Sequence, residues 1–453
     1  MAPRSTGRPN VIFFLSDQQR WDNMGIHGNP LDLAPNFDRT ARQGTHLANT
    51  FTCQPVCAPA RSSLQTGLYA TNTGVWRNDL SLPVARRTLA HHFRAAGYTT
   101  GYVGKWHLVE HKAAGAVAPE QRGGYEYWLA SNVLEFTSDA YDTIMYNNDG
   151  QPVRLPGYRA DAVTDAAIRY IDANQNRPFF LFVSPIEPHF QNHRAHFTAP
   201  DGYAERYANR WIPPDLAALG GSTQQHIPGY YGMVKRVDEC LGRLLDAVKS
   251  LGLSDKTIIV FTSDHGSHFE TRPGYDKRSC HESSIRVPAA ITGPGFVGGG
   301  RLQQLVSLID LPPTLLDAAG LPVPPEMQGR SIMPLIRHEP VDWPGEVFIQ
   351  ISESQVGRAI RTQRWKYNVV AKDKDGWQHA SSDRYTEDCL YDLYADPYEL
   401  ANLIGFSSHR GVVQVLRQRL IRRMLEAGEE EPMIEPAPQR ASHRKVLPEE
   451  LYA

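Results

Sequence analysis

Four short apolar segments of the chain are each followed by side chains that can bind a cation or move a proton. These side chains are Asp17 and Gln18, Lys105 and His107, His189, and Asp264 and His265. Carboxylate, amide and imidazole groups bind divalent cations, and histidine and lysine are also common acids and bases. Loops are generally polar, so one such segment would say little, but four of them together favour an active site.

The four apolar segments themselves are predicted to be strands. They are residues 10–16, 98–104, 178–184 and 257–263. Each is continuously apolar and rich in β-branched or aromatic residues, which is typical of strands buried on both faces of a mainly parallel sheet. Helical patterns lie between them, at residues 89–96, 162–173 and 230–251. We therefore expect an α/β fold with a large mixed, mostly parallel sheet sandwiched by helices, and ligands of such sheets bind beyond the carboxyl ends of the strands.

A second, smaller unit is expected beyond residue 340. Residues 337–346 are polar and contain two prolines, and shorter, partly alternating strand patterns follow them. Such patterns are typical of an antiparallel sheet. A helical pattern at residues 412–427 carries an apolar face. We expect a catalytic domain over residues 1–340 and a smaller C-terminal α+β subdomain with an extended tail over residues 341–453.

Cys57 lies in an unusual setting. The segment CAPAR begins at Cys57; Pro59 suits the first turn of a helix, and Gly67 suits its end. Cys57 would then occupy a helix N-terminus, where free N–H groups favour an anion, with Arg61 one turn further on. A cysteine in that field has a lowered pKa. The local pattern alone supports only a weak prediction of a thiol nucleophile, because most intracellular cysteines are buried and inert.

This segment and several others resemble the type I, formylglycine-dependent sulfatases of the alkaline-phosphatase-like superfamily. The segment Cys57-Ala-Pro-Ala-Arg61 matches the family's Cys-x-Pro-Ser/Ala-Arg signature, and residues 104–107 match its Gly-Lys-Trp-His element. Further matches are Asp17-Gln18, Ser263-Asp264-His265-Gly266, Lys277 with Glu282, Arg286, Val287 and Pro288, and Leu390-Tyr391-Asp392-Leu393. They stand in the family's order, so the resemblance implies the sulfatase fold for most of the chain.

The resemblance implies a metal site. Its ligands would be Asp17, Gln18, residue 57, Asp264 and His265. The family usually binds Ca²⁺, which a mostly oxygen ligand set suits. Gln18 stands where many members have Asp, and His265 where many have Asn. The site therefore loses a negative charge and gains a nitrogen ligand, which suits Mn²⁺ or Zn²⁺ better than Ca²⁺, while the oxygen ligands also suit Mg²⁺.

The resemblance also implies a modified nucleophile. In the family a formylglycine-generating enzyme oxidises the cysteine that corresponds to Cys57 to Cα-formylglycine. The hydrated aldehyde would attack sulfur, with Arg61 orienting residue 57. Lys105 and Lys277 would hold the sulfate and stabilise the charge that develops on it.

Four further side chains receive roles on the same basis. His189, helped by Lys277, is the candidate acid for the leaving alcohol, and His107 is the candidate base that lets sulfate leave. Asn78, which follows the signature helix, and His268, which lies beyond the Asp-His pair, are candidate substrate contacts.

These residues predict a hydrolase of sulfate monoesters, acting first on carbohydrate sulfates and next on aryl or alkyl sulfates. The alternative is a phosphonate monoester or phosphodiester hydrolase of the same superfamily, because those relatives share the Asp-Gln and Asp-His pairs; the Gly-Lys-Trp-His element favours the sulfatase. A non-catalytic binding protein would be expected to lack Cys57, a ligand or a lysine, and none is missing. A cysteine hydrolase with unmodified Cys57 would need partners that no motif identifies.

The amino-acid composition argues against several other classes of protein. Hydrophobic residues make up 41% of the 453 residues, enough for a large core. Lys and Arg number 47 against 49 Asp and Glu, so there is no basic excess of the kind that nucleic acids or anionic membranes attract. Five cysteines do not make a disulfide scaffold. No signal peptide and no apolar run of about 18 residues are visible, so we expect a cytoplasmic protein.

Overall fold

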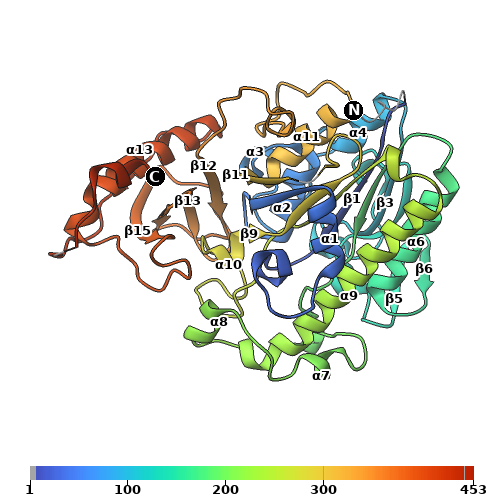
Figure 1. Ribbon diagram of the computed structural model, residues 1–453, viewed down its shortest axis with the longest axis horizontal. Helices are drawn as coiled ribbons and strands as arrows, with labels where there is room; N and C mark the ends of the chain where they lie inside the picture. Colours follow the sequence, from blue (N-terminus) through green and yellow to red (C-terminus); the bar gives the residue numbers. More distant parts are fainter. Residues whose placement is uncertain (1–6, 299, 443) are drawn as a thin grey trace.

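A large mixed sheet forms the centre of the molecule and is covered by helices on both faces, as the sequence predicts (Figure 1). The computed structural model describes residues 7–298, 300–442 and 444–453. The expectation that the N-terminus carries no signal peptide concerns in part residues 1–6, which lie outside the described residues. The strands of this sheet are β1 (Asn10–Ser16), β2 (Thr45–Phe51), β3 (Thr99–Lys105), β4 (Tyr127–Ser131), β5 (Thr143–Tyr146), β6 (Pro152–Leu155), β7 (Phe179–Ser184), β8 (Thr257–Ser263), β9 (Arg286–Val287), β10 (Ala289–Thr292) and β11 (Arg301–Ser307).

The strand order explains why four polar segments meet. The order is β11-β2-β10-β8-β1-β7-β3-β4-β5-β6, and β9 pairs with β2. The run β8-β1-β7-β3 is parallel throughout, so the carboxyl ends of these four strands share one edge. Antiparallel pairing begins at β10 on one side and at β5 on the other. Strands β1 and β8 have the predicted limits, β7 begins one residue later than predicted, and β3 is shifted by one residue at both ends.

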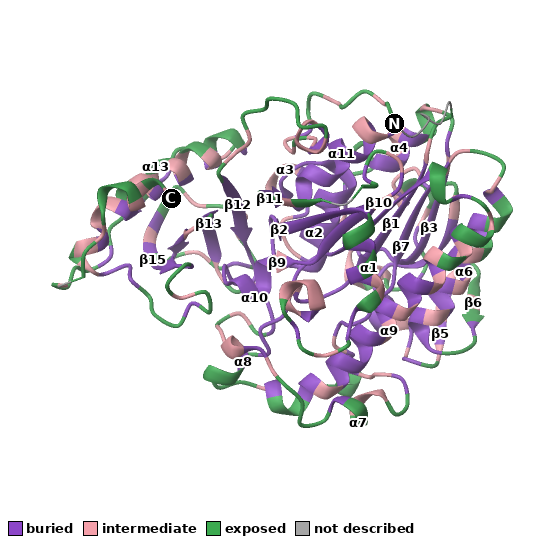
Figure 2. Cartoon of the chain, viewed as in Figure 1, coloured by how far each residue is buried: buried purple, intermediate pink, exposed green. Residues whose placement is uncertain are grey.

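Burial on both faces accounts for the unbroken apolar sequence of the central strands. Along β1, Val11 and Phe13 pack into one core cluster and Ile12 and Phe14 into another. Successive side chains of a strand point to opposite faces, so a strand covered on both sides needs apolar residues at every position. Figure 2 shows these strands as buried along their whole length.

Two groups of helices cover the two faces of the large sheet. The first core cluster includes residues of α2 (Cys57–Thr66), α4 (Leu89–Ala95) and α11 (Leu311–Ala318). The second includes residues of α1 (Pro35–Gln43), α6 (Arg159–Asn174) and α9 (Thr223–Ser250), which extends upstream of its predicted start past Pro228. The shorter helices are α3 (Ala70–Thr73), α5 (Leu134–Thr137), α7 (Tyr203–Tyr207), α8 (Pro214–Ala218), α10 (Glu282–Ile285) and α12 (Met333–Ile336).

The C-terminal part folds around a second sheet, drawn in orange and red in Figure 1. Its strands are β12 (Glu346–Ile351), β13 (Val356–Thr362), β14 (Trp365–Ala371), β15 (Arg384–Asp392) and β16 (Met433–Glu435). The first four are antiparallel, as predicted, whereas β16 lies parallel to β15. Helix α13 (Arg410–Glu426) packs on this sheet through Leu416, Leu420 and Met424, which are buried.

A buried ion network joins the two parts. Glu282, at the start of α10, lies 3.2 Å from the guanidinium of Arg361 and 2.8 Å from Nζ of Lys366. Lys366 also contacts Glu399 at 2.5 Å. Beside this network, the Sγ atoms of Cys280 and Cys389 lie 3.6 Å apart, one in each part. The charges compensate one another, which allows them to be buried between the two sheets.

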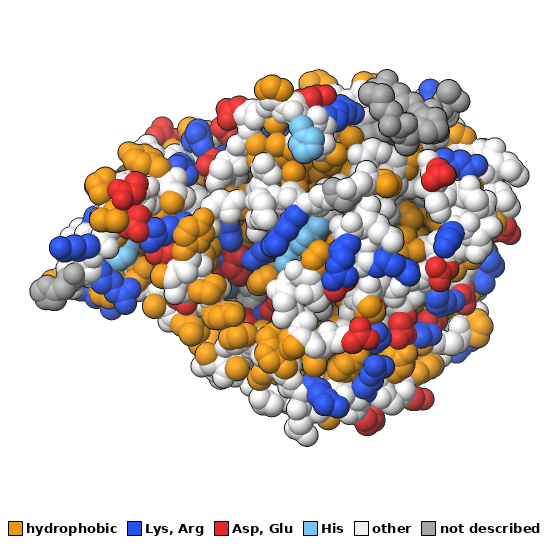
Figure 3. All heavy atoms as spheres, in the orientation of Figure 1, with side chains coloured by type: hydrophobic (Ala, Val, Ile, Leu, Met, Phe, Trp, Pro, Cys, Tyr) orange, Lys and Arg blue, Asp and Glu red, His pale blue; other side chains and the backbone are white. Residues whose placement is uncertain are grey.

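Side chains of both charges are mixed on the face of the molecule that Figure 3 shows. In Figure 3 acidic and basic side chains lie side by side over the face that carries α6 and α9, where Arg236 and Arg243 both pair with Asp161. Within the described residues, no helix combines the length and the apolar character needed to cross a membrane.

Candidate active site and metal centre

The predicted site residues meet at the carboxyl edge of the parallel strands. Asp17 and Gln18 directly follow β1, Lys105 ends β3, and Asp264 directly follows β8. Cys57 is the first residue of α2, whose end at Gly67 has the left-handed backbone that glycine allows, with φ of 71°. All of these side chains are buried. The fold thus collects groups that are far apart in the sequence into one enclosed polar site.

Cys57 is surrounded by groups of positive charge and of metal-ligand type. Its Sγ lies 3.0 Å from Nζ of Lys277, 3.2 Å from Nε2 of His265 and 3.6 Å from Oδ1 of Asp17. Burial acts to raise the pKa of the thiol, but Lys105 and Lys277 outweigh it and hold that pKa well below its usual value. The structure therefore favours an anion at position 57, as expected for a helix N-terminus.

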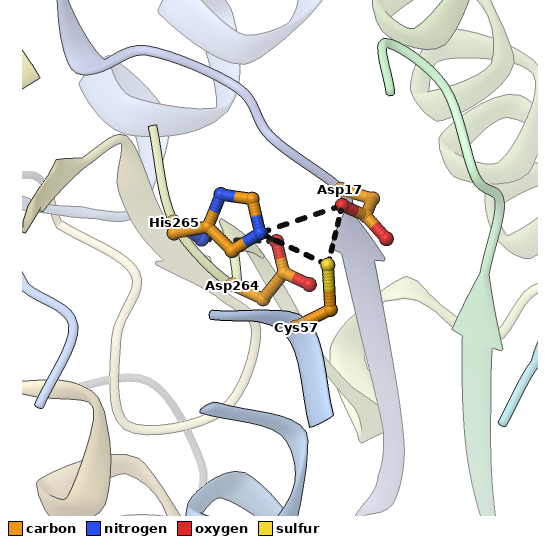
Figure 4. A group of neighbouring side chains, drawn as sticks. All are labelled: Asp17, Cys57, Asp264 and His265. Atoms are coloured by element: carbon orange, nitrogen blue, oxygen red, sulfur yellow. Dashed lines mark hydrogen bonds and ion pairs between the residues drawn. The ribbon is translucent and has the colours of Figure 1, made fainter. Parts of the chain in front are cut away.

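Four of the five predicted ligands form a compact group (Figure 4). One ligand atom from each of Asp17, Cys57, Asp264 and His265 lies within 4.8 Å of the others. The Nδ1 atom of His265 lies 2.9 Å from the carbonyl oxygen of Gly266, an arrangement in which Nδ1 donates and Nε2 faces the group. Oδ2 of Asp264 is buried and accepts no hydrogen bond of good geometry from the described residues, although it forms an ion pair with Arg61. Two carboxylates, an imidazole and an anionic side chain fit a divalent cation.

Gln18 is held so that its amide oxygen faces the same site. Its Nε2 donates to Oγ of Ser267 at 3.3 Å, and its Oε1 accepts from Nζ of Lys277 at 3.2 Å. Its backbone has a φ of 67°, and its N–H donates to Oδ1 of Asp264. The amide oxygen is therefore available as the fifth ligand that the sequence predicts.

Arg61 links several of these groups and is itself buried. Its guanidinium lies 3.0 Å from Oδ2 of Asp17 and 3.2 Å from Oδ2 of Asp264. It also donates to the carbonyl oxygen of Lys105 and to Oγ of Ser184. One side chain of α2 thus fixes the ends of four strands relative to Cys57, and it acts by positioning.

Lys105 has two carboxylate partners, of which only Asp17 is among the site residues predicted from the sequence. Its Nζ lies 2.8 Å from Oδ2 of Asp17 and 2.8 Å from Oε1 of Glu135, on α5. Burial acts to raise the pKa of Glu135, but Lys105 and His107 lower it to about 2, so the side chain is ionised. Glu135 belongs to no motif, and its four-residue helix is too short to show a periodic pattern.

His189 and Lys277 form the pair proposed for the leaving group. Nζ of Lys277 lies 3.2 Å from Nε2 of His189, and Nδ1 of His189 lies 2.6 Å from the carbonyl oxygen of Phe190. Lys277 is also 3.1 Å from Nε2 of His265. The arrangement places a histidine and a lysine in direct contact beside residue 57.

His107 also lies close to Cys57 and Lys105. Its ring is buried, and its Nε2 is 2.9 Å from Nε2 of His111. Burial and the charge of Lys105 lower the pKa of His107, while a hydrogen bond with Cys57 acts in the opposite direction. A neutral imidazole beside residue 57 suits the role of base.

The two predicted substrate contacts differ in position. Oδ1 of Asn78 accepts the N–H of Ala58 at 3.0 Å, directly beside Cys57. His268 is fully buried, and its Nε2 lies 3.2 Å from the carbonyl oxygen of Lys277. His268 thus contacts the backbone of the Lys277 loop, and its role as a substrate contact stays a prediction.

The C-terminal part contributes a carboxylate that the sequence analysis did not identify. Oε1 of Glu353 accepts the N–H of Asn78 at 2.8 Å, and its Oε2 lies 2.5 Å from Nε of Arg278. Glu353 has a φ of 66° in the turn between β12 and β13. Arg77, next to Asn78, lies over the rings of Trp76 and Trp377 at 5.4 and 5.8 Å. Arginine, carboxylate and tryptophan side chains thus lie close to Asn78.

The chain matches known proteins along most of its length. A family model described as Sulfatase matches residues 9–321, and one described as N-sulphoglucosamine sulphohydrolase, C-terminal, matches residues 272–426. The ulvan-active sulfatase of Formosa agariphila is 31% identical over 93% of this chain and 82% of that protein. The N-acetylglucosamine-6-O-sulfatase of Bacteroides thetaiotaomicron is 26% identical over 92% of this chain and 86% of that protein.

Solved structures share the fold. BT4656 in complex with its substrate D-glucosamine-2-N,6-O-disulfate gives a TM-score of 0.77 at 25% identity, covering 94% of this chain and 99% of that one. The phosphonate monoester hydrolase from Silicibacter pomeroyi gives 0.70 at 22% identity, covering 92% and 96%. The similarity to the phosphonate monoester hydrolase therefore shows a shared fold only.

Proposed function

The chain belongs to the sulfatase family and hydrolyses sulfate monoesters, and we propose that its substrates are sulfate esters of carbohydrates. The observation that carries the activity is Cys57 within its Cys-x-Pro-x-Arg segment, 3.0 Å from Lys277 and surrounded by the four-residue ligand group. Phosphonate monoester or phosphodiester hydrolysis is the alternative, and its support is a shared fold.

Two observations support a carbohydrate as the leaving group. The two relatives named above act, by their names, on ulvan and on N-acetylglucosamine-6-O-sulfate. In this chain, Asn78 lies beside residue 57, Glu353 contacts Asn78 and pairs with Arg278, and Trp377 is about half exposed. Sugars present many hydroxyl groups and apolar ring faces, which such a set of polar and aromatic side chains can bind.

The family implies a divalent metal and a formylglycine at position 57, and the residues present fit both. We propose Ca²⁺ as the metal, held by Asp17, Gln18, Asp264 and His265 together with residue 57. When present, the two groups supply an activated oxygen nucleophile on residue 57 from which sulfate can leave again. A formylglycine-generating enzyme is the maturation partner that this requires.

The chain's own side chains perform the remaining steps. Lys105 and Lys277 bind the sulfate oxygens and stabilise negative charge. His189, in contact with Lys277, donates a proton to the oxygen of the departing alcohol. His107 accepts a proton at residue 57, and Arg61 keeps that residue aligned with the carboxylates.

Peptide mass spectrometry and a substrate panel test this function. Protein co-expressed with a formylglycine-generating enzyme should carry residue 57 with oxygen in place of sulfur and two fewer hydrogens, and only this form should turn over. The panel should hold sulfated mono- and disaccharides, 4-nitrophenyl sulfate, a phosphodiester and a phosphonate monoester. Higher kcat/KM for a phosphonate than for every sulfate would reverse the choice, and activity of protein with unmodified Cys57 would refute the nucleophile.

A further inference from the structure

We propose that Glu135 makes the anion site prefer monoanionic esters to dianions. Its fixed negative charge beside Lys105 weakens the binding of dianions more than that of monoanions. The inference rests on the proposed role of Lys105 in binding sulfate. It concerns a residue for which neither the family signatures nor the ligand group provides a role.

The geometry shows why Glu135 can act on a bound anion. An ammonium group has three N–H donors. Those of Lys105 face Asp17 and Glu135 at 2.8 Å each, so the third remains for a substrate oxygen. Asp17 shares the same Oδ2 atom with the guanidinium of Arg61 and so offsets only part of the charge of Lys105, whereas Glu135 places a further negative charge beside the ammonium group. The anion that meets the third donor therefore meets a partly neutralised lysine.

One carboxylate oxygen of Glu135 lacks a hydrogen-bond partner within the described residues. Its side chain is 5% exposed, and its Oε2 is buried without a hydrogen-bond partner among the described residues. The residue is nevertheless fixed, because its backbone carbonyl accepts a hydrogen bond from Nε2 of Gln191. A buried carboxylate oxygen without a partner costs stability, and hydrogen bonds among the described residues do not offset that cost here.

The reaction itself changes the charge of the bound anion. A sulfate monoester carries one negative charge, and its hydrolysis by water yields the alcohol, sulfate with two negative charges, and one proton. A phosphate monoester already carries two near pH 8. Electrostatic energy is proportional to charge, so the repulsion from Glu135 is twice as large for a dianion as for a monoanion at the same position. Glu135 would thus disfavour phosphate monoesters and speed the release of the sulfate product.

Calorimetric titration of protein carrying unmodified Cys57, with Ca²⁺ present, tests this without turnover. The probes are methyl sulfate and inorganic sulfate at pH 8. In Glu135→Gln we expect sulfate to bind about tenfold more tightly and methyl sulfate about threefold more tightly. The removed repulsion energy is twice as large for the dianion, so the factor by which its affinity increases is the square of the factor for the monoanion. Glu120→Gln removes an exposed carboxylate and should change neither affinity, and Glu135→Asp should retain the wild-type ratio.

A second readout uses the modified enzyme. The ratio of kcat/KM for 4-nitrophenyl sulfate to that for 4-nitrophenyl phosphate should fall about threefold in Glu135→Gln, with stronger inhibition by sulfate. An equal increase in affinity for both anions in Glu135→Gln would overturn the inference, since Glu135 would then only position Lys105. Should Glu135→Gln not fold, wild-type protein that binds sulfate more than tenfold tighter than methyl sulfate would overturn it too. Wild-type protein that binds neither anion would refute the proposed function as well.

Discussion

Nζ of Lys277 lies 3.0 Å from Sγ of Cys57, although Lys277 belongs to no helix or strand. Its loop is held by backbone hydrogen bonds on either side, from His268 to Asp276 and from Arg278 to Pro55. The second of these bonds ties the loop to the segment that leads into α2. Residue 57 and its lysine are therefore positioned by the same piece of backbone.

Replacing Lys277 should remove activity and leave the fold intact. Lys277→Ala deletes the ammonium group that faces residue 57 and His189, so we expect kcat/KM for a sulfate ester to fall by about 10²–10³. Steady-state kinetics with the modified enzyme measures this. Lys249→Ala, an exposed lysine at the end of α9, is the matched control and should have wild-type activity. A loss of less than tenfold in Lys277→Ala would contradict the assigned role.

Metal removal should affect both activity and stability. Asp17 and Asp264 are fully buried within one ligand group, so a chelator should abolish hydrolysis and lower Tm, and added metal should restore both. His265→Asn replaces a nitrogen ligand with an oxygen ligand, and we expect it to raise the activity ratio of Ca²⁺ over Mn²⁺. An unchanged metal preference, or an unchanged Tm after chelation, would speak against the proposed ligands.

The network at Glu282 should make stability depend on pH. Burial acts to raise the pKa of Glu282, but Arg361 and Lys366 hold it below its usual value of 4.5. The folded pKa lies below the unfolded one, so the stabilisation is complete above about pH 4.5 and is lost as pH falls towards the folded pKa. Glu282→Gln leaves Lys366 and Arg361 less compensated, and we expect it to lower the free energy of unfolding by about 3–5 kcal/mol at pH 7.

Urea unfolding at pH 7, 5, 4 and 3 measures this dependence. The wild type should lose stability steeply below pH 4.5, and Glu282→Gln should show a shallower slope over the same range. The control is Glu430→Gln, at an exposed carboxylate near the C-terminus. Parallel slopes for the wild type and Glu282→Gln would show that this carboxylate does not titrate with folding.

The sequence was sufficient for the elements whose pattern is local. The unbroken apolar runs predict β1 and β8 because both faces of these strands are covered, and the Pro59 and Gly67 signals predict α2. By contrast, β16 pairs with β15 across a helix and a long connection, and its three residues carry no pattern of their own.

The same distinction separates the site residues that were predicted from those that were missed. Asp17 and Asp264 follow strands and Lys105 ends one, and the order of these strands brings the three side chains together. Glu135 and Glu353 reach the site through a four-residue helix and a turn with positive φ, and only tertiary packing brings them beside Lys105 and Asn78. Neither has a spacing from which its partner could be inferred.

The packing of α13 allows a stability prediction with an internal control. Leu420 is fully buried against the C-terminal sheet, and Leu425, on the same helix, is 48% exposed. Leu420→Ala should lower the free energy of unfolding by about 2–5 kcal/mol, since it removes buried methyl groups and leaves a cavity. Leu425→Ala should change it by less than about 0.5 kcal/mol. Urea unfolding followed by circular dichroism compares the two, and similar losses would mean that α13 does not pack through Leu420.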